Sequence, residues 1–158
     1  MESNAARREP RRETGMTQAC ESAAWSDVAG WKSLLARHHR LFEPMVEGAS
    51  IGIVARESVD ADSGGMLVWR RAADGMRVER GVFNGFADCG VGVLFVAEPG
   101  ALDALHARLD DNALGAMKLQ LRAGTMLLYV IAAKKQLLDD GYEDFLEALG
   151  LAFLGACR

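Results

Sequence analysis

The residues that most often carry chemistry are few and scattered in this sequence. Asp103 and His106 have the spacing of an acid–base pair on one helix face, but no Ser or Cys nucleophile lies near them in the sequence. His38 and His39 are adjacent, and adjacent helical side chains point about 100° apart, so they cannot chelate one metal ion together. We therefore interpret Asp103 and His106 as a surface ion pair and the other two histidines as surface residues.

Two further patterns begin a binding motif without completing it. Asp60 and Asp62 resemble the start of a calcium loop, but no third ligand and no closing Glu follow at the required positions. Gly85 and Gly90 do not lead into a helix, so they do not form a phosphate-binding loop. The sequence therefore predicts no catalytic residues, no cofactor and no metal site.

Composition places the chain in an ordinary class. Its 158 residues are 50% hydrophobic and 25% charged, which suits a domain with a sizeable core. The longest apolar run, residues 126–133, is too short to span a bilayer, and the first residues lack the apolar stretch of a secretory signal. Cysteines at positions 20, 89 and 157 show no CxxC spacing, which favours reduced thiols in a bacterial-type cytoplasm.

Charge is divided unevenly along the chain. The net charge is −4, yet four arginines and three glutamates make the first fifteen residues slightly positive, so the remainder is acidic. An acidic body argues against a nucleic-acid interface, which requires a clustered basic face. Residues 1–23 are polar and aperiodic, which predicts a disordered tail before a single α+β domain over residues 24–158.

The elements of the first half follow from periodicity and turn residues. Ser26 and Asp27 offer N-caps for an amphipathic helix reaching about residue 46, which Gly48 would close. Residues 51–55 form a strand, and residues 58–65 have the composition of a loop. Strands at 66–71 and 76–83 flank Asp74-Gly75, which predicts a hairpin with a type I′ turn, and residues 91–96 form a buried strand.

In the second half, a helix begins near Pro99 and reaches about residue 109. Residues 117–123 alternate between apolar and polar side chains, which predicts a strand, and Gly124 forms a corner. An apolar helix over 125–138 and an amphipathic helix over 142–156 then follow. The predicted fold is α+β, a mostly antiparallel sheet of about five strands with helices packed on one face.

Residues 86–138 resemble the sterol carrier protein type 2 family. The matching pieces are Ala87-Asp88 before the buried strand, the helix at 102–109, MKLQLRAG at 117–124 and the apolar segment 125–138. The pattern departs from that family in Met117, where Gly is usual, in Thr125, where Asp is usual, and in the additional last helix.

The resemblance implies a hydrophobic tunnel between sheet and helices that holds a lipid or an acyl chain. Several methionines are flexible enough to line such a cavity, although in a solid core they would only fill space. The residues expected in the cavity wall are Met45, Val68, Phe95, Leu119, Leu121, Met126 and Val130.

Three functions remain open at this point. The first is a non-catalytic carrier or accessory protein for an apolar ligand, without a cofactor. The second is an accessory subunit that binds a protein partner or a second copy through Leu149, Leu151, Phe153 and Leu154, which occupy more than one face of the last helix. An enzyme is disfavoured, because Cys89, His106 and His38 show no catalytic spacing.

Overall fold

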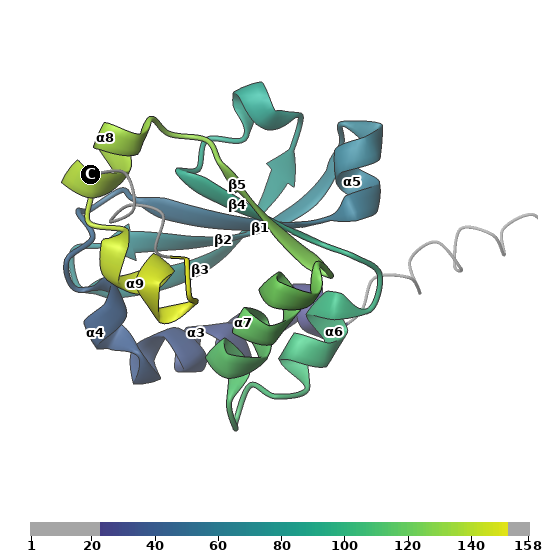
Figure 1. The fold of residues 1–158 in the computed structure, drawn as a ribbon, viewed down its shortest axis with the longest axis horizontal. Helices are drawn as coiled ribbons and strands as arrows, with labels where there is room; N and C mark the ends of the chain where they lie inside the picture. The colour runs from purple at the N-terminus through teal and green to yellow at the C-terminus, as the bar shows by residue number, and fades with distance from the viewer. Residues whose placement is uncertain (1–22, 152–158) are drawn as a thin grey trace, which may run out of the picture.

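A five-stranded sheet forms the centre of the molecule (Figure 1). A computed structural model describes residues 23–151 of the chain. The strands are β1 (Ser50–Ala55), β2 (Gly64–Ala72), β3 (Gly75–Phe83), β4 (Val93–Ala97) and β5 (Met126–Val130), in the order β3-β2-β1-β4-β5. Only β1 and β4 run parallel, while the other neighbouring pairs are antiparallel. The predicted α+β class, with a mostly antiparallel sheet of about five strands, is confirmed.

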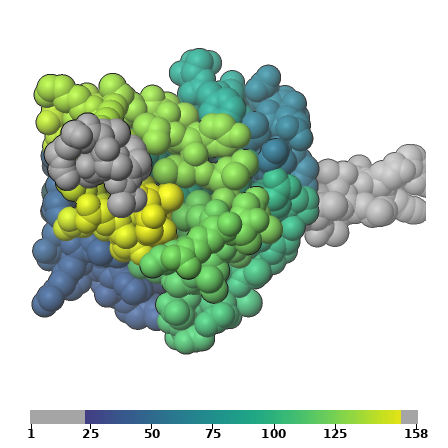
Figure 2. All heavy atoms as spheres, in the orientation of Figure 1, coloured from purple at the N-terminus to yellow at the C-terminus, as the bar shows by residue number. Residues whose placement is uncertain are grey.

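Most helices cover one face of this sheet, which we call the helical face. They are α2 (Ala23–Ser26), α3 (Val28–Arg37), α4 (His39–Phe42), α6 (Ala101–His106), α7 (Ala113–Ala123), α8 (Lys134–Asp139) and α9 (Glu143–Ala148). The opposite face carries a smaller apolar cluster covered by α5 (Arg56–Ala61) and the 3-10 turn η1 (Phe86–Asp88). In the space-filling view, α7 and α9 form neighbouring parts of the surface, with α3 and α4 beside them (Figure 2).

The predicted first helix is divided into α2, α3 and α4. The Asp27 side chain accepts a hydrogen bond from the Gly30 amide and so caps α3, as predicted. Trp31, Leu34 and Leu35 form its buried stripe. The helical backbone is interrupted at His38 and ends at Phe42, earlier than predicted, because Pro44 has no amide hydrogen with which to continue the helical hydrogen bonds. Gly48 therefore lies in a loop and does not close the helix.

The hairpin of β2 and β3 is confirmed, but its turn lies one residue earlier than predicted. Ala72 pairs with Gly75, so Ala73 and Asp74 are the two turn residues. A type I′ turn requires positive φ at both turn residues, and Asp62 has the only positive φ among the described non-glycine residues. Gly75 instead opens β3 with φ +138°, a conformation that favours glycine.

The segment 58–65 is not simply a loop, because much of it belongs to α5. This helix ends at Asp62, whose left-handed backbone (φ +55°) closes the last turn. Val59 packs on the apolar cluster of the opposite face. The residue types of this segment are typical of loops, so the sequence did not predict α5, a short helix that tertiary packing stabilises.

The predicted order of strand and helix at 117–138 is wrong. Residues 113–123 form α7, capped by the Asn112 side chain on the Gly115 amide and closed by Gly124 in the left-handed region (φ +84°). The buried and half-buried positions Leu114, Met117 and Leu121 also fit helical spacing. Over so short a window, the apolar residues fit both the two-residue period of a strand and the 3.6-residue period of a helix. The helix caps at Asn112 and Gly124 decide in favour of the helix.

The following apolar run forms β5 rather than a helix. Met126 pairs with Ala97 and Val130 with Val93, in antiparallel register with β4. The predicted apolar helix is thereby reduced to α8. A short apolar run cannot be assigned to strand or helix by periodicity alone, and here pairing with a buried strand determines the outcome.

The remaining elements lie where predicted, but two helices are shorter. The strand predicted at 51–55 is β1, the buried strand at 91–96 is β4, and the helix near Pro99 is α6, which ends at His106 rather than near residue 109. The helix predicted over 142–156 is α9, which ends at Ala148 ahead of Gly150 in the left-handed region (φ +80°), and its buried residues include Phe145 and Leu146 as expected. Of the tail predicted for residues 1–23, Ala23 begins α2, whereas residues 1–22, like positions 152–156 of the predicted last helix, lie outside the described residues.

Candidate functional site

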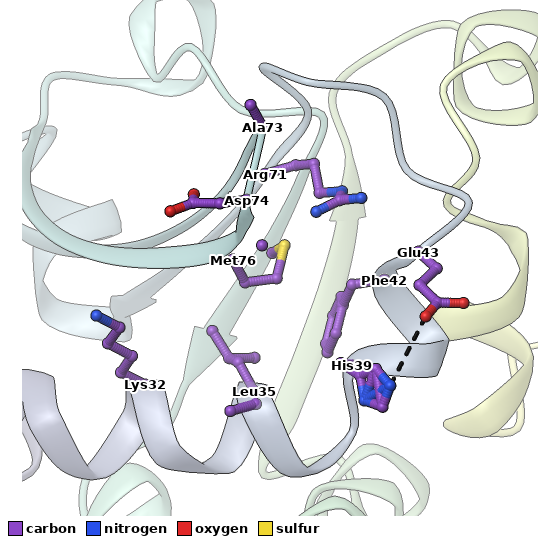
Figure 3. A pocket seen from close by; sticks show the side chains of 11 residues that line it. Lys32, Leu35, His39, Phe42, Glu43, Arg71, Ala73, Asp74 and Met76 are labelled. Atoms are coloured by element: carbon purple, nitrogen blue, oxygen red, sulfur yellow. Dashed lines mark ion pairs between the residues drawn. The ribbon is translucent and has the colours of Figure 1, made fainter.

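A groove of about 490 Å³ lies between α3 and α4 on one side and the tip of the β2–β3 hairpin on the other (Figure 3). Its floor consists of Leu35, Phe42 and Met76, which we call the groove floor. An adjoining hollow of about 320 Å³ shares Lys32, Asp74 and Met76 with the groove, so the depression continues along β3. The additional apolar residues of that hollow are Val28 and Val78.

The residues of the groove are positioned mainly by α3 and by the end of β2 next to the hairpin turn. Leu35 lies one turn beyond Trp31 on the buried stripe of α3, which crosses β3. On β2, the alternation places Leu67, Trp69 and Arg71 on the helical face. The first two are fully buried, whereas Arg71 is half-buried because it lies near the hairpin tip, where the helical layer leaves the groove open.

The Arg71 guanidinium is fixed at the edge of the groove. Its Nε donates to the Met45 carbonyl oxygen at 3.1 Å, and its Nη1 donates to the Ala72 carbonyl oxygen at 3.2 Å. Figure 3 shows the guanidinium extending past Met76, away from the carboxylate of Asp74. Two backbone acceptors therefore hold a cationic side chain next to an apolar floor.

The groove is lined by two cations, Lys32 and Arg71, and by two carboxylates, Glu43 and Asp74. Asp74 lies 3.7 Å from Arg77, and Glu43 lies 3.7 Å from His39, which is charged only when protonated. Among the described residues, no carboxylate lies within ion-pair distance of Lys32 or Arg71. The groove therefore combines an apolar floor with two cations that have no carboxylate partner in the described part of the chain.

The residues predicted to line a cavity do not surround one common space. Leu119 is 62% exposed on α7, Val130 is 43% exposed on β5, and Leu121 is half-buried. The others are buried in apolar clusters: Met45, Phe95 and Met126 on the helical face, and Val68 on the opposite face. None of the seven is among the side chains that line the groove.

The residues predicted for a partner interface are used at least partly inside the molecule. Leu149 is buried in the core of the helical face, and Leu151 packs against it while remaining half-buried. Phe153 and Leu154 lie outside the described residues.

His106 pairs with a different residue from the one predicted. Its Nε2 lies 2.8 Å from Oδ2 of Asp27, whereas a pair with Asp103 was expected. The hydrogen bond from His106, followed by that from the Gly30 amide, lowers the pKa of the Asp27 carboxyl below its usual value. The pair joins α6 to the start of α3 over a sequence separation that no local pattern reveals.

The other chemically reactive candidates remain apart. His39 is exposed beside Glu43, and burial, followed by the charge of Arg37, lowers the pKa of His38. Cys89 is buried, with Sγ 3.3 Å from the Phe86 carbonyl oxygen. Within residues 23–151, no group of three or more His, Cys, Asp or Glu side chains could hold a metal ion.

None of the helices between residues 23 and 151 is both long enough and apolar enough to cross a membrane.

Comparison with known proteins yields a likeness in structure and no match in sequence. No protein-family model matches the chain, and no curated protein matches it. Among solved structures, it is similar to a conserved hypothetical protein of Thermus thermophilus, for which a sterol-carrier role has been suggested. The two are 15% identical, and the alignment covers 83% of this chain and 85% of that chain with a TM-score of 0.43. These values assign neither a family nor a ligand to this chain.

The sequence analysis did not identify the groove, although one signal for it was present. In β2, Arg71 continues the alternation of two buried apolar residues, Leu67 and Trp69. An arginine at the end of an apolar strand face indicates a place where the core reaches the surface. Its neighbours Lys32, Leu35 and Phe42 belong to helices whose crossing with β3 is set by tertiary packing.

Proposed function

We propose that this chain is a non-catalytic binding protein that holds the apolar part of a small amphipathic molecule in the groove between α3–α4 and the β2–β3 hairpin. The observation that carries the proposal is an apolar floor of Leu35, Phe42 and Met76 in a surface groove. Its volume of about 490 Å³ falls within the ~300–1,000 Å³ typical of small-molecule sites. The role that follows is that of a carrier or accessory protein.

The proposal places the ligand in the groove because the core below is filled by aromatic rings. Phe42 of the groove floor packs on Phe145, with ring centroids 5.2 Å apart. Phe145 in turn contacts Trp69 at 6.3 Å, and Trp69 contacts Trp31 at 6.0 Å. A ligand between sheet and helices would have to displace these rings, whereas a ligand in the groove would only cover Met76 and its neighbours.

Met76 is suited to such a role. It is half-buried, follows Gly75 as the second residue of β3, and presents a flexible, polarizable side chain to the groove. Methionine can adjust its three torsions to ligands of different shape without moving the backbone. The groove floor thus combines two nearly buried residues with one adaptable residue.

A fluorescence titration with the uncharged apolar dye Nile red tests the proposal. We expect saturable binding to the wild-type protein and at least about tenfold weaker binding to Met76→Trp, since a large ring would fill the groove. The matched control is Leu119→Trp, because Leu119 is exposed on α7 and lies outside the groove. Absence of saturable dye binding, or equal losses in both variants, would overturn the proposal.

A further inference from the structure

Building on the proposed function, we infer that the ligand of the groove carries an anionic head group that pairs with Arg71, while its chain lies over the groove floor. The ligand class is therefore a single-chain amphipath with a carboxylate or a phosphate ester at one end. Lys32, on the other side of Met76 in Figure 3, adds a longer-range attraction.

The distribution of charges supports an anion rather than a cation or a neutral group. The two acids that line the groove lie close to His39 and Arg77, respectively. Arg71 and Lys32 have no carboxylate at ion-pair distance among residues 23–151. A cationic head group would be repelled by the fixed Arg71 guanidinium, whereas an anionic one would pair with it, since Arg71 has no carboxylate at ion-pair distance among the described residues.

The geometry of Arg71 identifies it as the main contact. Its Nε and Nη1 atoms are committed to the carbonyl oxygens of Met45 and Ala72, which fix the plane of the guanidinium. A fixed, half-buried guanidinium loses little conformational freedom on binding, and its planar fork suits carboxylate and phosphate oxygens. The head group would therefore lie beside the hairpin tip, next to Met76.

Lys32 has a different, weaker role. It is exposed on α3, one turn before Leu35, so its aliphatic stem can lie along the groove while its ammonium stays in water. A flexible, hydrated charge contributes attraction but little fixed geometry. Replacing Lys32 should therefore weaken binding less than replacing Arg71.

The test compares three ligands with the same ten-carbon chain: decanoate, decyl phosphate and decyltrimethylammonium, each titrated below its micelle concentration. Calorimetry on the wild-type protein should show both anions binding at least about tenfold more tightly than the cation. The carboxylate and phosphate arms establish which head group the site prefers. Equal affinity for anion and cation would overturn the inference.

Variants locate the preference for anions. Arg71→Gln should abolish it, and Arg71→Lys, which keeps the charge but loses the fork, should retain part of it. Lys32→Met should reduce the preference for anions about threefold. The Lys32 side chain has no ion pair among the described residues. Arg122→Met is the control, because Arg122 is exposed on α7 and does not line the groove. A preference that survives both Arg71→Gln and Lys32→Met would overturn the inference.

The two proposals fail in different ways. If Nile red binds in the groove but the three head groups are not distinguished, the proposed function stands and the head-group inference is overturned. If decanoate binds through Arg71 but Nile red does not bind, the apolar-ligand proposal is overturned and the anion site remains. If neither binds, both are overturned.

Discussion

Two adjoining parts of the helical face, joined by the contact of Phe42 with Phe145, differ in how completely they are packed. At the α8–α9 end, Phe145 lies among three aromatic rings, and the buried Tyr142 hydroxyl accepts a hydrogen bond from the Ser50 amide and donates one to the Ser50 carbonyl oxygen. At the α3–α4 end, the helices leave a groove beside the hairpin tip. We call these the closed end and the groove end.

The comparison indicates how one layer of helices can serve two purposes. The closed end resembles an ordinary protein interior, where aromatic rings interlock. The groove end replaces part of that packing with cationic side chains and an adaptable methionine. Substitutions at the closed end should therefore change stability, whereas those at the groove end should change binding.

The largest effect is expected for Phe145→Ala at the closed end. This ring is fully buried, with neighbouring centroids at 5.2 Å for Phe42 and 6.2 Å for Phe95. Its removal leaves a cavity and should lower the free energy of unfolding by about 3–5 kcal/mol. Urea denaturation measures the change, and Val82→Ala at a position 64% exposed should stay within about 0.5 kcal/mol. A loss of similar size in both variants would contradict the comparison.

Tyr142→Phe should have the next largest effect. The change removes both hydrogen bonds to Ser50, at 2.9 and 3.0 Å, and leaves the Ser50 amide unpaired in a buried site, while the Ser50 carbonyl keeps its hydrogen bond from the Gly92 amide. We expect a destabilisation of about 1–3 kcal/mol in the same urea assay. Nile red binding should be unchanged, and weaker dye binding would show that the two ends are coupled.

Introducing tryptophan at two methionines compares the buried core with the groove end. Met126 is fully buried on the helical face away from the groove, so Met126→Trp should overpack the core and cost about 1–3 kcal/mol. Met76→Trp should change stability by less than about 1 kcal/mol, because the new ring has a groove to occupy. If Met126→Trp left stability intact and abolished dye binding, the ligand would lie in a core cavity instead.

The smallest effect concerns pH. The lowered pKa of Asp27 means that its carboxylate stabilises the fold above its ordinary pKa of about 3.9, and this contribution is lost as pH falls through the lower folded value. Asp27→Asn keeps a residue suited to capping α3 but removes the charge facing His106. Wild type should melt a few degrees above the variant at pH 6. This difference should shrink below pH 4, and a constant gap would exclude the linkage.

Local signals located the first helical region, β1 and the hairpin in the first half of the fold, although they missed α5. Asp27, the 31-34-35 stripe and the hairpin each consist of neighbours in sequence whose roles are set by nearby residues. The segment 117–133 was not predictable in this way. Met117, Leu119 and Leu121 alternate as in a strand, yet only Met117 is fully buried, because the helix ending at Gly124 turns Leu119 to solvent.

The candidate site depends still more on tertiary structure. Leu35 and Phe42 were predicted as part of an apolar helix face and Met76 as part of a hairpin, and each of these assignments is correct as far as it goes. Their meeting in a groove depends on where α3 crosses β3, and neither sequence segment encodes that crossing alone. The Asp27–His106 pair was missed for the same reason.

The central claim is that the groove end binds an amphipathic ligand, and an amide chemical-shift titration of ¹⁵N-labelled protein with sodium decanoate tests it most directly. The account predicts saturable shifts concentrated at residues 32–43 and 71–76, with little change at α7 and β5. Saturable shifts concentrated at residues 113–130, around Leu119 and Leu121, would contradict it, as would the absence of any saturable shift.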